Sequence, residues 1–441
     1  NTKKKKINEI FEKTYSNSFD KKNFKHIEHH RSHLASAFYP SSFNKSVVLS
    51  VDGFGDFSSC AWGIGEDCRI KIDKKISFPH SLGIFYTTIT QYLGFANYGD
   101  EYKVMGLAPY GKEKYVEKLF KLINLKNDGT FELDLSYFKH HREIVSKNWD
   151  GGVPSMEVNY TKKLIDLLGP PRKSNELIKQ KHKDIAKAAQ IIYEKAFFNI
   201  LTFLNKKYKL NKLCIAGGCG ANSVANGKIL NQSGFDEIYI APDPGDAGGA
   251  IGAALEIWHQ ISVKRSSPSN SCFYGYKEET KDIESLLFSK KNQLIFKKNK
   301  IKIINFKDNL DEKFQEKKLL KIVAEAISKG DVVGWYQDKM EWGPRALGNR
   351  SILCDPRNSK MKNILNKKIK KRESFRPFAP SILREKVKYW FEISKDDLLN
   401  VPFMMQVLQI RNEKQKLIPA VTHVDGSGRL QTVNEKDNGK Y

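Results

Sequence analysis

The chain has 441 residues, of which 40% are hydrophobic and 28% charged, as in globular proteins of two or three domains. No apolar run is long enough to span a membrane and no secretion leader opens the chain, so a cytoplasmic protein without membrane contact is expected. The net charge of +25 is compatible with a polyanion-binding surface. However, 62 of the 75 basic residues are lysines spread over the whole chain, which favours a general enrichment in lysine over a dedicated binding surface. The six cysteines form no C-x-x-C pair, which argues against a zinc ribbon and favours free thiols.

The first predicted element is a helix that carries HHRSHLASAF (29–38). On a helix, residues i and i+4 share a face, so His29 and His33 point together, whereas His30 is turned about 100° away. Two imidazoles on one face make half of a metal site, which oxygen ligands from elsewhere would complete. Ordinary surface or half-buried histidines are the alternative.

Three short strands are expected next, at 46–52, 58–64 and 68–76, as an antiparallel meander with GFGD as its first turn. A helix is expected over 80–95. Asp52 ends the first strand, and Asp246 lies in a later loop before a helix, so both could complete the histidine pair. Two histidines and two carboxylates suit Fe(II), Mn(II) or Zn(II) better than Mg(II).

After a mixed region at 113–180, a long helix is predicted over 182–208, followed by two strand–glycine loop–helix units, at 212–231 and 237–260. In the first loop, Gly217 and Gly218 let backbone N–H groups approach a ligand, and Asn222 can cap a helix over 222–231, whose N-terminus favours anions. Two such loops after a β-meander are typical of the nucleotide cleft of actin-like ATPases. A tight packing turn is the alternative for each loop.

The polar segment SVKRSSPSNS (262–271) is the best candidate for a domain boundary, and helix and strand patterns alternate after it. Beyond it lie six of the thirteen arginines of the chain: Arg345, Arg350, Arg357, Arg372, Arg376 and Arg384. Planar guanidinium groups bind phosphate and carboxylate, and the aromatic and proline residues between these arginines are typical of pocket walls. The segment predicts an anion pocket, with a solvated charged surface as the alternative.

Seven motifs, in this order, resemble the O-carbamoyltransferase family, which includes nodulation-factor and antibiotic carbamoyltransferases. They are HHRSHLASAF (29–38), KVMGLAPYG (103–111), AGGCGANSVANGKI (216–229), APDPGDAGGAIGAA (241–254), WGPRALGNRSIL (342–353), FRPFAPSIL (375–383) and THVDGSGRLQTV (422–433). The resemblance runs from about residue 26 to the end and implies an α/β protein. An actin-like (ASKHA, ribonuclease H-like) ATPase-type domain is expected over 1–265 and a YrdC-like α/β domain over 272–441. Compared with the family, the N-terminal hairpin and the last part of the YrdC-like domain are expected to be missing.

The resemblance implies a two-step activity. Carbamoyl phosphate and ATP give carbamoyl adenylate in the YrdC-like domain, and the carbamoyl group then passes to a hydroxyl of a sugar, antibiotic or similar small molecule at a metal in the actin-like domain. It implies His29, His33, Asp52 and Asp246 as ligands of that divalent metal, with Fe(II) ahead of Mn or Zn. A homodimer is left open, and nucleic acid is not an expected partner.

The resemblance also implies roles for residues of the glycine loop and the arginine segment. Gly217, Gly218 and Asn222 are expected at the nucleotide of the actin-like domain. Arg345, Arg350, Lys370, Arg372 and Arg376 are expected to line the carbamoyl adenylate pocket. Arg345 and Arg350 would neutralise the charge that develops there, and His30 is a candidate general base at the metal.

Three other functions are compatible with parts of the sequence. A tRNA-modifying, threonylcarbamoyl-type enzyme would use the basic charge, but the presence of both domain patterns with WGPRALGNRSIL argues against it. A non-catalytic nucleotide- or RNA-binding protein would release neither pyrophosphate nor AMP. A sugar kinase on the actin-like fold would leave the arginine segment without a purpose.

Overall fold

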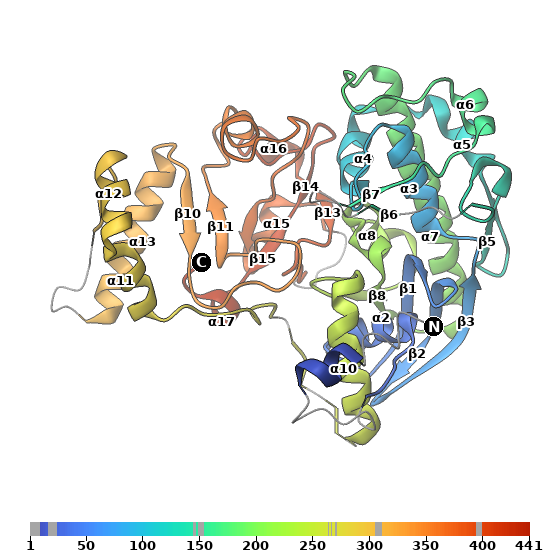
Figure 1. The fold of residues 1–441 in the computed structure, drawn as a ribbon, viewed down its shortest axis with the longest axis horizontal. Coiled ribbons are helices and arrows are strands. Elements are labelled where there is room, and N and C mark those ends of the chain that lie inside the picture. Colours follow the sequence, from blue (N-terminus) through green and yellow to red (C-terminus); the bar gives the residue numbers. More distant parts are fainter. Residues whose placement is uncertain are drawn as a thin grey trace.

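The computed structural model describes residues 9–15, 24–143, 147–148, 154–262, 264–265, 267–269, 271–304, 311–393 and 399–441. Figure 1 shows a larger part built on one sheet with helices on both faces, and a smaller part that runs from α11 (Thr280–Phe288) to the C-terminus. Among the helices of these residues, none is both long and apolar enough to cross a bilayer.

The larger part is organised by a five-stranded sheet of order β3-β2-β1-β8-β9. Its strands are β1 (Lys45–Gly55), β2 (Ser58–Glu66), β3 (Arg69–Ser77), β8 (Lys212–Ala216) and β9 (Glu237–Ile240). The first three form an antiparallel meander, while β1, β8 and β9 are parallel. The predicted meander and the two later strands are therefore confirmed, and the sheet is a mixed α/β sheet.

Helices cover both faces of this sheet (Figure 1). Val47 and Leu49 pack with α3 (Leu82–Tyr92) and α7 (Gln180–Tyr208). Val48 faces the other way and packs with α2 (His29–Phe38). Because successive strand residues point to opposite faces, the apolar run of β1 is what a strand buried on both sides requires.

Close packing of α2 against α10 (Asp246–Ile261) explains the second glycine-rich stretch. A Cβ atom on Gly252 would lie 1.7 Å from the carbonyl oxygen of Ser32, and one on Gly248 would lie 2.1 Å from that of Asp243. Gly252 thus lets the backbones of α2 and α10 approach, and Gly248 leaves room for the loop that precedes α10. In this stretch the structure shows glycines that serve helix packing, and a ligand role of the loop before α10 stays a prediction.

The single helix predicted over 222–231 is wrong. The chain forms two short helices, α8 (Ser223–Asn226) and α9 (Ile229–Gln232), with Gly227 between them. A Cβ atom on Gly227 would lie 1.8 Å from the carbonyl oxygen of Val407, so the backbone of the smaller part passes directly over this break. Contact with a distant segment, which periodicity does not report, interrupts the helix.

The predicted polar linker at 262–271 is held against the larger part where the structure describes it. The guanidinium of Arg265 donates hydrogen bonds to the carbonyl groups of Phe38, Ser41 and Phe43. The backbone N–H of Ser269 donates to Pro40 at 2.8 Å. The segment thus follows the loop after α2.

The remaining elements of the larger part are short. They are α4 (Glu101–Leu107), α5 (Val116–Phe120), α6 (Lys162–Leu168), the strand pairs β4 (Ile123–Leu125) with β5 (Phe131–Leu133) and β6 (Lys147–Asn148) with β7 (Ser155–Met156), and single turns at Ala108–Tyr110, Glu113–Tyr115, Leu135–Tyr137 and Gly218–Ala221.

The described residues of the smaller part form three two-stranded sheets and several helices. The sheets are β10 (Val333–Tyr336) with β11 (Arg350–Leu353), β12 (Ser381–Leu383) with β15 (Gln431–Val433), and β13 (Val407–Gln409) with β14 (Ser427–Arg429). The helices are α11, α12 (Lys290–Lys298), α13 (Glu312–Ser328), α14 (Met361–Ile364), α15 (Val387–Trp390), α16 (Asn412–Gln415) and α17 (Glu435–Asn438), with turns at Leu365–Ile369 and Arg384–Lys386. A small core includes Ile382, Phe391, Ile410 and Leu430. The α/β class is confirmed, and the actin-like and YrdC-like identities stay predictions.

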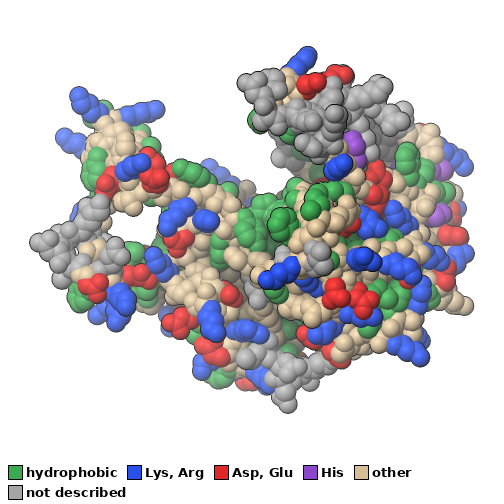
Figure 2. All heavy atoms as spheres, turned by 90° about the horizontal axis from the view of Figure 1, so that it is seen from below, with side chains coloured by type: hydrophobic (Ala, Val, Ile, Leu, Met, Phe, Trp, Pro, Cys, Tyr) green, Lys and Arg blue, Asp and Glu red, His purple; other side chains and the backbone are tan. Residues whose placement is uncertain are grey.

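Basic side chains are spread over the face shown in Figure 2, where acidic side chains lie between them. Many side chains of opposite charge form exposed ion pairs, such as Lys45–Glu66 at 2.8 Å and Lys212–Glu237 at 2.9 Å. The sequence analysis favoured lysines scattered over the surface, and on this face they are scattered and form no single basic surface.

Candidate functional site

Four side chains from three elements converge at one edge of the sheet, and their potential ligand atoms all lie within 4.8 Å of one another. His29 and His33 lie one turn apart at the start of α2, with their Nε2 atoms 3.0 Å apart. Both Nε2 atoms contact the same oxygen of Asp52, at 2.9 and 3.1 Å. The Oδ1 atom of Asp246 lies 3.8 and 3.6 Å from the two Nε2 atoms.

Local backbone geometry fixes this arrangement. Asp52 lies near the end of β1, and its other oxygen accepts a hydrogen bond from the backbone N–H of Gly218 at 3.0 Å. A Cβ atom on Gly55 would lie 2.0 Å from the ring of His29, so only glycine leaves room for the imidazole. Asp246 is the first residue of α10, where the helix dipole favours a negative charge.

The electrostatics of the four residues favour a cation between them. Burial disfavours the charge of Asp52, but hydrogen bonds from His29 and His33 outweigh it and hold the pKa of Asp52 well below its usual value. Burial likewise disfavours a charged His33, but Asp246 and Asp52 outweigh it and raise the pKa of His33 to about 9. Two carboxylates thus attract positive charge to this point.

The donor set fits a divalent transition metal. Two atoms that each lie about 2.1 Å from one ion are roughly 3 to 3.5 Å apart, close to the separations seen here. Two imidazole nitrogens and two carboxylate oxygens suit Fe(II), Mn(II) or Zn(II). The side chain of Asp246 is 67% exposed, so the site is open to a reactant from solvent. His29, His33, Asp52 and Asp246 are the four residues that the sequence predicted.

His30, the predicted general base, lies away from this opening. Its side chain is fully buried, and its Nδ1 atom pairs with the hydroxyl of Ser50 in β1 at 2.9 Å. Burial lowers the pKa of His30, so the ring is neutral. Its role as a base stays a prediction.

The glycine loop after β8 lies beside the candidate metal centre. Gly217 has φ +87°, and a Cβ atom there would lie 2.2 Å from the carbonyl oxygen of Val51 in the next strand. Asn222 accepts a hydrogen bond from the N–H of Ala225, so the predicted helix cap is confirmed. Its amide also pairs with that of Gln190 on α7. The nucleotide roles of Gly217, Gly218 and Asn222 stay predictions.

Most of the predicted arginine set gathers in the smaller part of the molecule. Burial and the charges of Arg372 and Arg376 lower the pKa of Lys370. Burial lowers the pKa of Arg345 to about 10, against the attraction of Asp243. Arg372 lies over the ring of Phe378 at 4.7 Å. Glu373 and Asp243 offset only part of this positive charge, since Arg376 pairs with Glu373 at 3.6 Å, and cations held this close together are suited to a polyanion.

Arg350 is placed differently from the rest of the predicted set. Its guanidinium donates to the carbonyl groups of Gln337 at 2.5 Å and Asp338 at 3.0 Å, and lies 3.5 Å over the ring of Tyr336. These contacts fasten the β10–β11 hairpin. The guanidinium N–H groups of Arg350 thus donate to backbone carbonyl groups of the hairpin, and the catalytic role expected of this residue stays a prediction.

Sequence reasoning missed Arg429, a further cation of this cluster. Burial, together with the charges of Arg345, Arg372 and Arg376, lowers its pKa. Within the described part of the chain, the Nε atoms of Arg345 and Arg429 are buried without a hydrogen-bond partner. Arg429 belongs to THVDGSGRLQTV, whose histidine and arginine beside glycines could have indicated a site.

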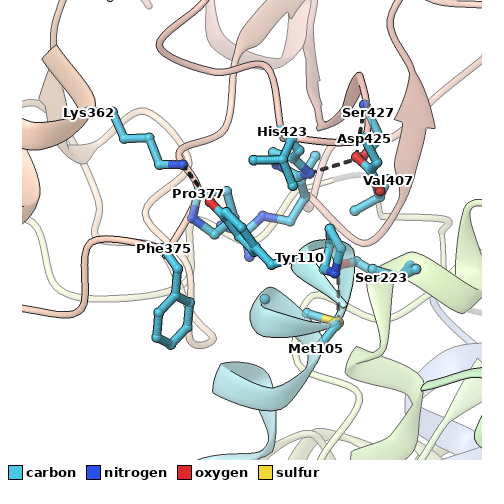
Figure 3. A pocket seen from close by; sticks show the side chains of 15 residues that line it. Met105, Tyr110, Ser223, Lys362, Phe375, Pro377, Val407, His423, Asp425 and Ser427 are labelled. Carbon is cyan, nitrogen blue, oxygen red and sulfur yellow. Dashed lines mark hydrogen bonds between the residues drawn. The ribbon is translucent and has the colours of Figure 1, made fainter. Parts of the chain in front are cut away.

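Arg429 of this cluster also lines a pocket between the two parts of the molecule (Figure 3). Its walls include Met105 and Tyr110 from the larger part and Lys362, Phe375 and His423 from the smaller part. The ammonium of Lys362 donates to the hydroxyl of Tyr110 at 3.2 Å. The pocket therefore depends on both parts.

The arginine cluster and the candidate metal centre lie next to each other. A Cβ atom on Gly343 would lie 3.1 Å from the carbonyl oxygen of Pro242, so the loop before Arg345 packs on the loop before Asp246. Asp243 interacts electrostatically with Asp246 and His33 on one side and with Arg345 on the other. Through these loops the arginine cluster and the four converging side chains are neighbours.

Two family models match the chain. Residues 3–255 match a model described as the carbamoyltransferase N-terminus, and residues 324–441 match one described as the carbamoyltransferase C-terminus. Together they cover most of the residues discussed above.

Two similar proteins match along most of this chain. An uncharacterised protein of Synechocystis, sll1178, is 39% identical over 94% of this chain and 66% of its own length. Nodulation protein NolO of Bradyrhizobium diazoefficiens is 34% identical over 94% of this chain and 69% of its own length. This chain thus spans about two thirds of these relatives. A crystal structure of HypF from T. kodakarensis aligns with a TM-score of 0.27 at 13% identity over 53% of this chain and 36% of that one, too low to bear on the fold.

Proposed function

Because this chain belongs to the carbamoyltransferase family, we propose that it is an O-carbamoyltransferase. Carbamoyl phosphate, ATP and water give carbamoyl adenylate, pyrophosphate and phosphate. The carbamoyl carbon then accepts the hydroxyl oxygen of a small acceptor such as a sugar or antibiotic, and AMP leaves. The observation that carries the proposal is the close approach of the arginine cluster to the four converging ligands.

The arginine cluster serves the first step. Arg345, Lys370, Arg372, Arg376 and Arg429 bind the phosphate groups and neutralise the charge that develops as the mixed anhydride forms. The burial of Arg345 and Arg429 makes their charges more effective than they would be in water. Enclosure between the two parts of the molecule also protects the water-sensitive adenylate.

The four ligands serve the second step. His29, His33, Asp52 and Asp246 would hold a divalent ion, which supplies Lewis acidity toward the carbamoyl oxygen or a binding place for the acceptor hydroxyl. Exposure of Asp246 admits the acceptor. Gly217 and Gly218 present backbone beside Asp52, where the nucleotide is expected.

We assign the larger part, residues 1–265, to an actin-like domain and residues 272–441 to a YrdC-like domain. The sheet order β3-β2-β1-β8-β9, an antiparallel meander joined to two parallel strands, supports the first assignment. The cation cluster supports the second. A tRNA-modifying enzyme is not favoured, because both carbamoyltransferase models match this one chain.

The test is to incubate the 441-residue protein with carbamoyl phosphate, ATP and a panel of hydroxylated acceptors. We expect pyrophosphate release in the absence of acceptor. With one acceptor of the panel we also expect AMP release and a mass gain of about 43 Da on that acceptor, since a carbamoyl group replaces one hydrogen. ADP as the product would indicate a kinase. Pyrophosphate release that needs threonine and bicarbonate in place of carbamoyl phosphate would indicate the tRNA-modifying reaction.

A further inference from the structure

Three side chains of the loop from His423 to Ser427 form a hydrogen-bond chain at the interdomain pocket (Figure 3). The hydroxyl of Ser427 donates to the Oδ1 atom of Asp425 at 2.6 Å, and the backbone N–H of Ser427 donates to the same atom at 3.1 Å. The Nδ1 atom of His423 lies 3.0 Å from the Oγ atom of Ser427.

The chemistry of these groups assigns every proton in the chain. A carboxylate only accepts hydrogen bonds, so the single hydroxyl proton of Ser427 points to Asp425. The Oγ atom of Ser427 must then accept from His423, so the imidazole proton is on Nδ1. Burial lowers the pKa of His423 to about 4, which keeps the ring neutral. The Nε2 atom therefore carries a bare lone pair.

That lone pair is unsatisfied in surroundings that otherwise suit an anion. The Nε2 atom is buried and has no hydrogen-bond partner among the residues that the structure describes. The charges of Arg429 and Lys362 lie close enough to help lower the pKa of His423. A phosphate dianion offers only acceptors, which this nitrogen would repel, so the group that pairs with the nitrogen has to be a donor.

Carbamoyl phosphate carries one such group beside its phosphate, the carbamoyl amino group. We propose that the Nε2 atom of His423 accepts a hydrogen bond from this amino group, while Arg429 and Lys362 bind the adjoining phosphate. The inference rests on the proposed function, because it names the residue that recognises the carbamoyl donor. His423 is then a specificity-determining residue, and Asp425 and Ser427 are positioning residues that fix its tautomer.

Discrimination against acetyl phosphate follows from this arrangement. Acetyl phosphate has the same phosphate but a methyl group in place of the amino group, and it would leave the lone pair unpaired. A site that pairs with a substrate N–H rejects the analogue that lacks it, here by roughly 10- to 100-fold for a single bond. ATP does not share this requirement.

The test compares three variants with the wild-type protein in pyrophosphate release without acceptor. His423→Phe should raise the KM for carbamoyl phosphate by roughly 10- to 100-fold and leave the inhibition constant of acetyl phosphate and the KM for ATP within about twofold. His423→Gln, whose amide oxygen can replace Nε2, should keep the discrimination. Ser427→Ala keeps the imidazole of His423 but removes the hydroxyl that accepts from Nδ1, so this variant should lose part of the discrimination between carbamoyl phosphate and acetyl phosphate.

Three results would overturn the inference. The first is an equal rise, in His423→Phe, of the KM for carbamoyl phosphate and the inhibition constant of acetyl phosphate. The second is an effect on the KM for ATP alone, which would mean that Nε2 contacts the nucleotide. The third is a His423→Phe protein that still discriminates between carbamoyl phosphate and acetyl phosphate. A wild-type protein that releases no pyrophosphate with carbamoyl phosphate would instead remove the proposed function, and this inference with it. Carbamoyl phosphate-dependent release without a change in His423→Phe would remove the inference alone.

Discussion

Asp52 is the residue that joins the candidate metal centre together, because one of its oxygens contacts both histidines and the other contacts the glycine loop. Asp52→Asn should lower the affinity for Fe(II) or Mn(II) by about 100-fold or more, since it removes a charged ligand. Isothermal titration of metal-free protein measures this. Asp128→Asn, at an exposed turn where the carboxylate pairs with Lys74, should leave the affinity unchanged. Equal affinities in the two variants would contradict the assignment.

Metal affinity should also depend on pH. Asp246 and Asp52, acting against burial, raise the pKa of His33 to about 9, so the metal-free site holds a proton on His33 at neutral pH. The metal must displace that proton, so the affinity should rise up to tenfold per pH unit below about 9 and level off above it. Titrations at pH 7 in buffers of different ionisation enthalpy should show about one proton released per ion. A pH-independent affinity between 7 and 9 would contradict this.

Residue types and spacing were enough to indicate which four side chains converge. His29 and His33 had to share a helical face, and Asp52 had to end a buried strand. Arg429 and His423 lie in a recognisable motif but were not assigned roles, because the arginines that surround Arg429 lie far from it in sequence. The contacts that engage Arg350 were hidden for the same reason, since they depend on how one hairpin folds back.

At the scale of elements, the contact between α2 and α10 sets where the histidines lie relative to Asp246. Gly252→Ala should destabilise the protein by about 1 to 3 kcal/mol, because its Cβ atom would lie 1.7 Å from the backbone of Ser32. Urea unfolding measures the change. Gly249→Ala in the same helix should be neutral or stabilising, since its Cβ atom would meet only the Ser32 hydroxyl at 3.2 Å. Equal effects of the two changes would contradict the packing argument.

Periodicity predicted the elements that pack on their own neighbours and missed those shaped by remote contacts. The helix expected over 182–208 is α7 (Gln180–Tyr208), and the meander has its predicted order. The helix expected over 222–231 is broken because Val407, far away in sequence, passes over Gly227. The glycines of α10 were interpreted as a ligand loop, since sequence does not distinguish backbone that approaches a ligand from backbone that approaches a helix.

At the scale of the whole molecule, the two steps need the two parts to stay docked. Buried Asn226 donates from α8 to the carbonyl groups of Gly220 at 2.7 Å and Met405 at 3.0 Å, which joins the larger part to the smaller. Asn226→Ala should lower the ratio of carbamoylated acceptor to pyrophosphate several-fold, because adenylate would escape to water.

Asn205→Ala is the matched control for this change. Its amide also donates to two carbonyl groups, of Leu210 and Gly234, but entirely within the larger part. It should lower stability by about 1 to 3 kcal/mol without changing the product ratio. Ratios that fall equally in both variants would show that the docking contact has no special role.

Family membership followed from motifs spread along most of the chain, and the matched family models confirm it. The acceptor did not follow, since no motif of the sequence reports the shape of the opening beside Asp246. The proximity of the arginine cluster to the metal ligands was also beyond the sequence, because it depends on how the loop before Arg345 packs on the loop before Asp246.

The central claim is that side chains far apart in sequence bind one ion beside the arginine cluster. Anomalous diffraction from crystals grown with Fe(II), Mn(II) or Zn(II) tests it most directly. A single peak about 2.0 to 2.3 Å from His29, His33, Asp52 and Asp246 is expected, with the absorption edge naming the metal. No peak between these groups in crystals soaked with any of the three ions would contradict the account.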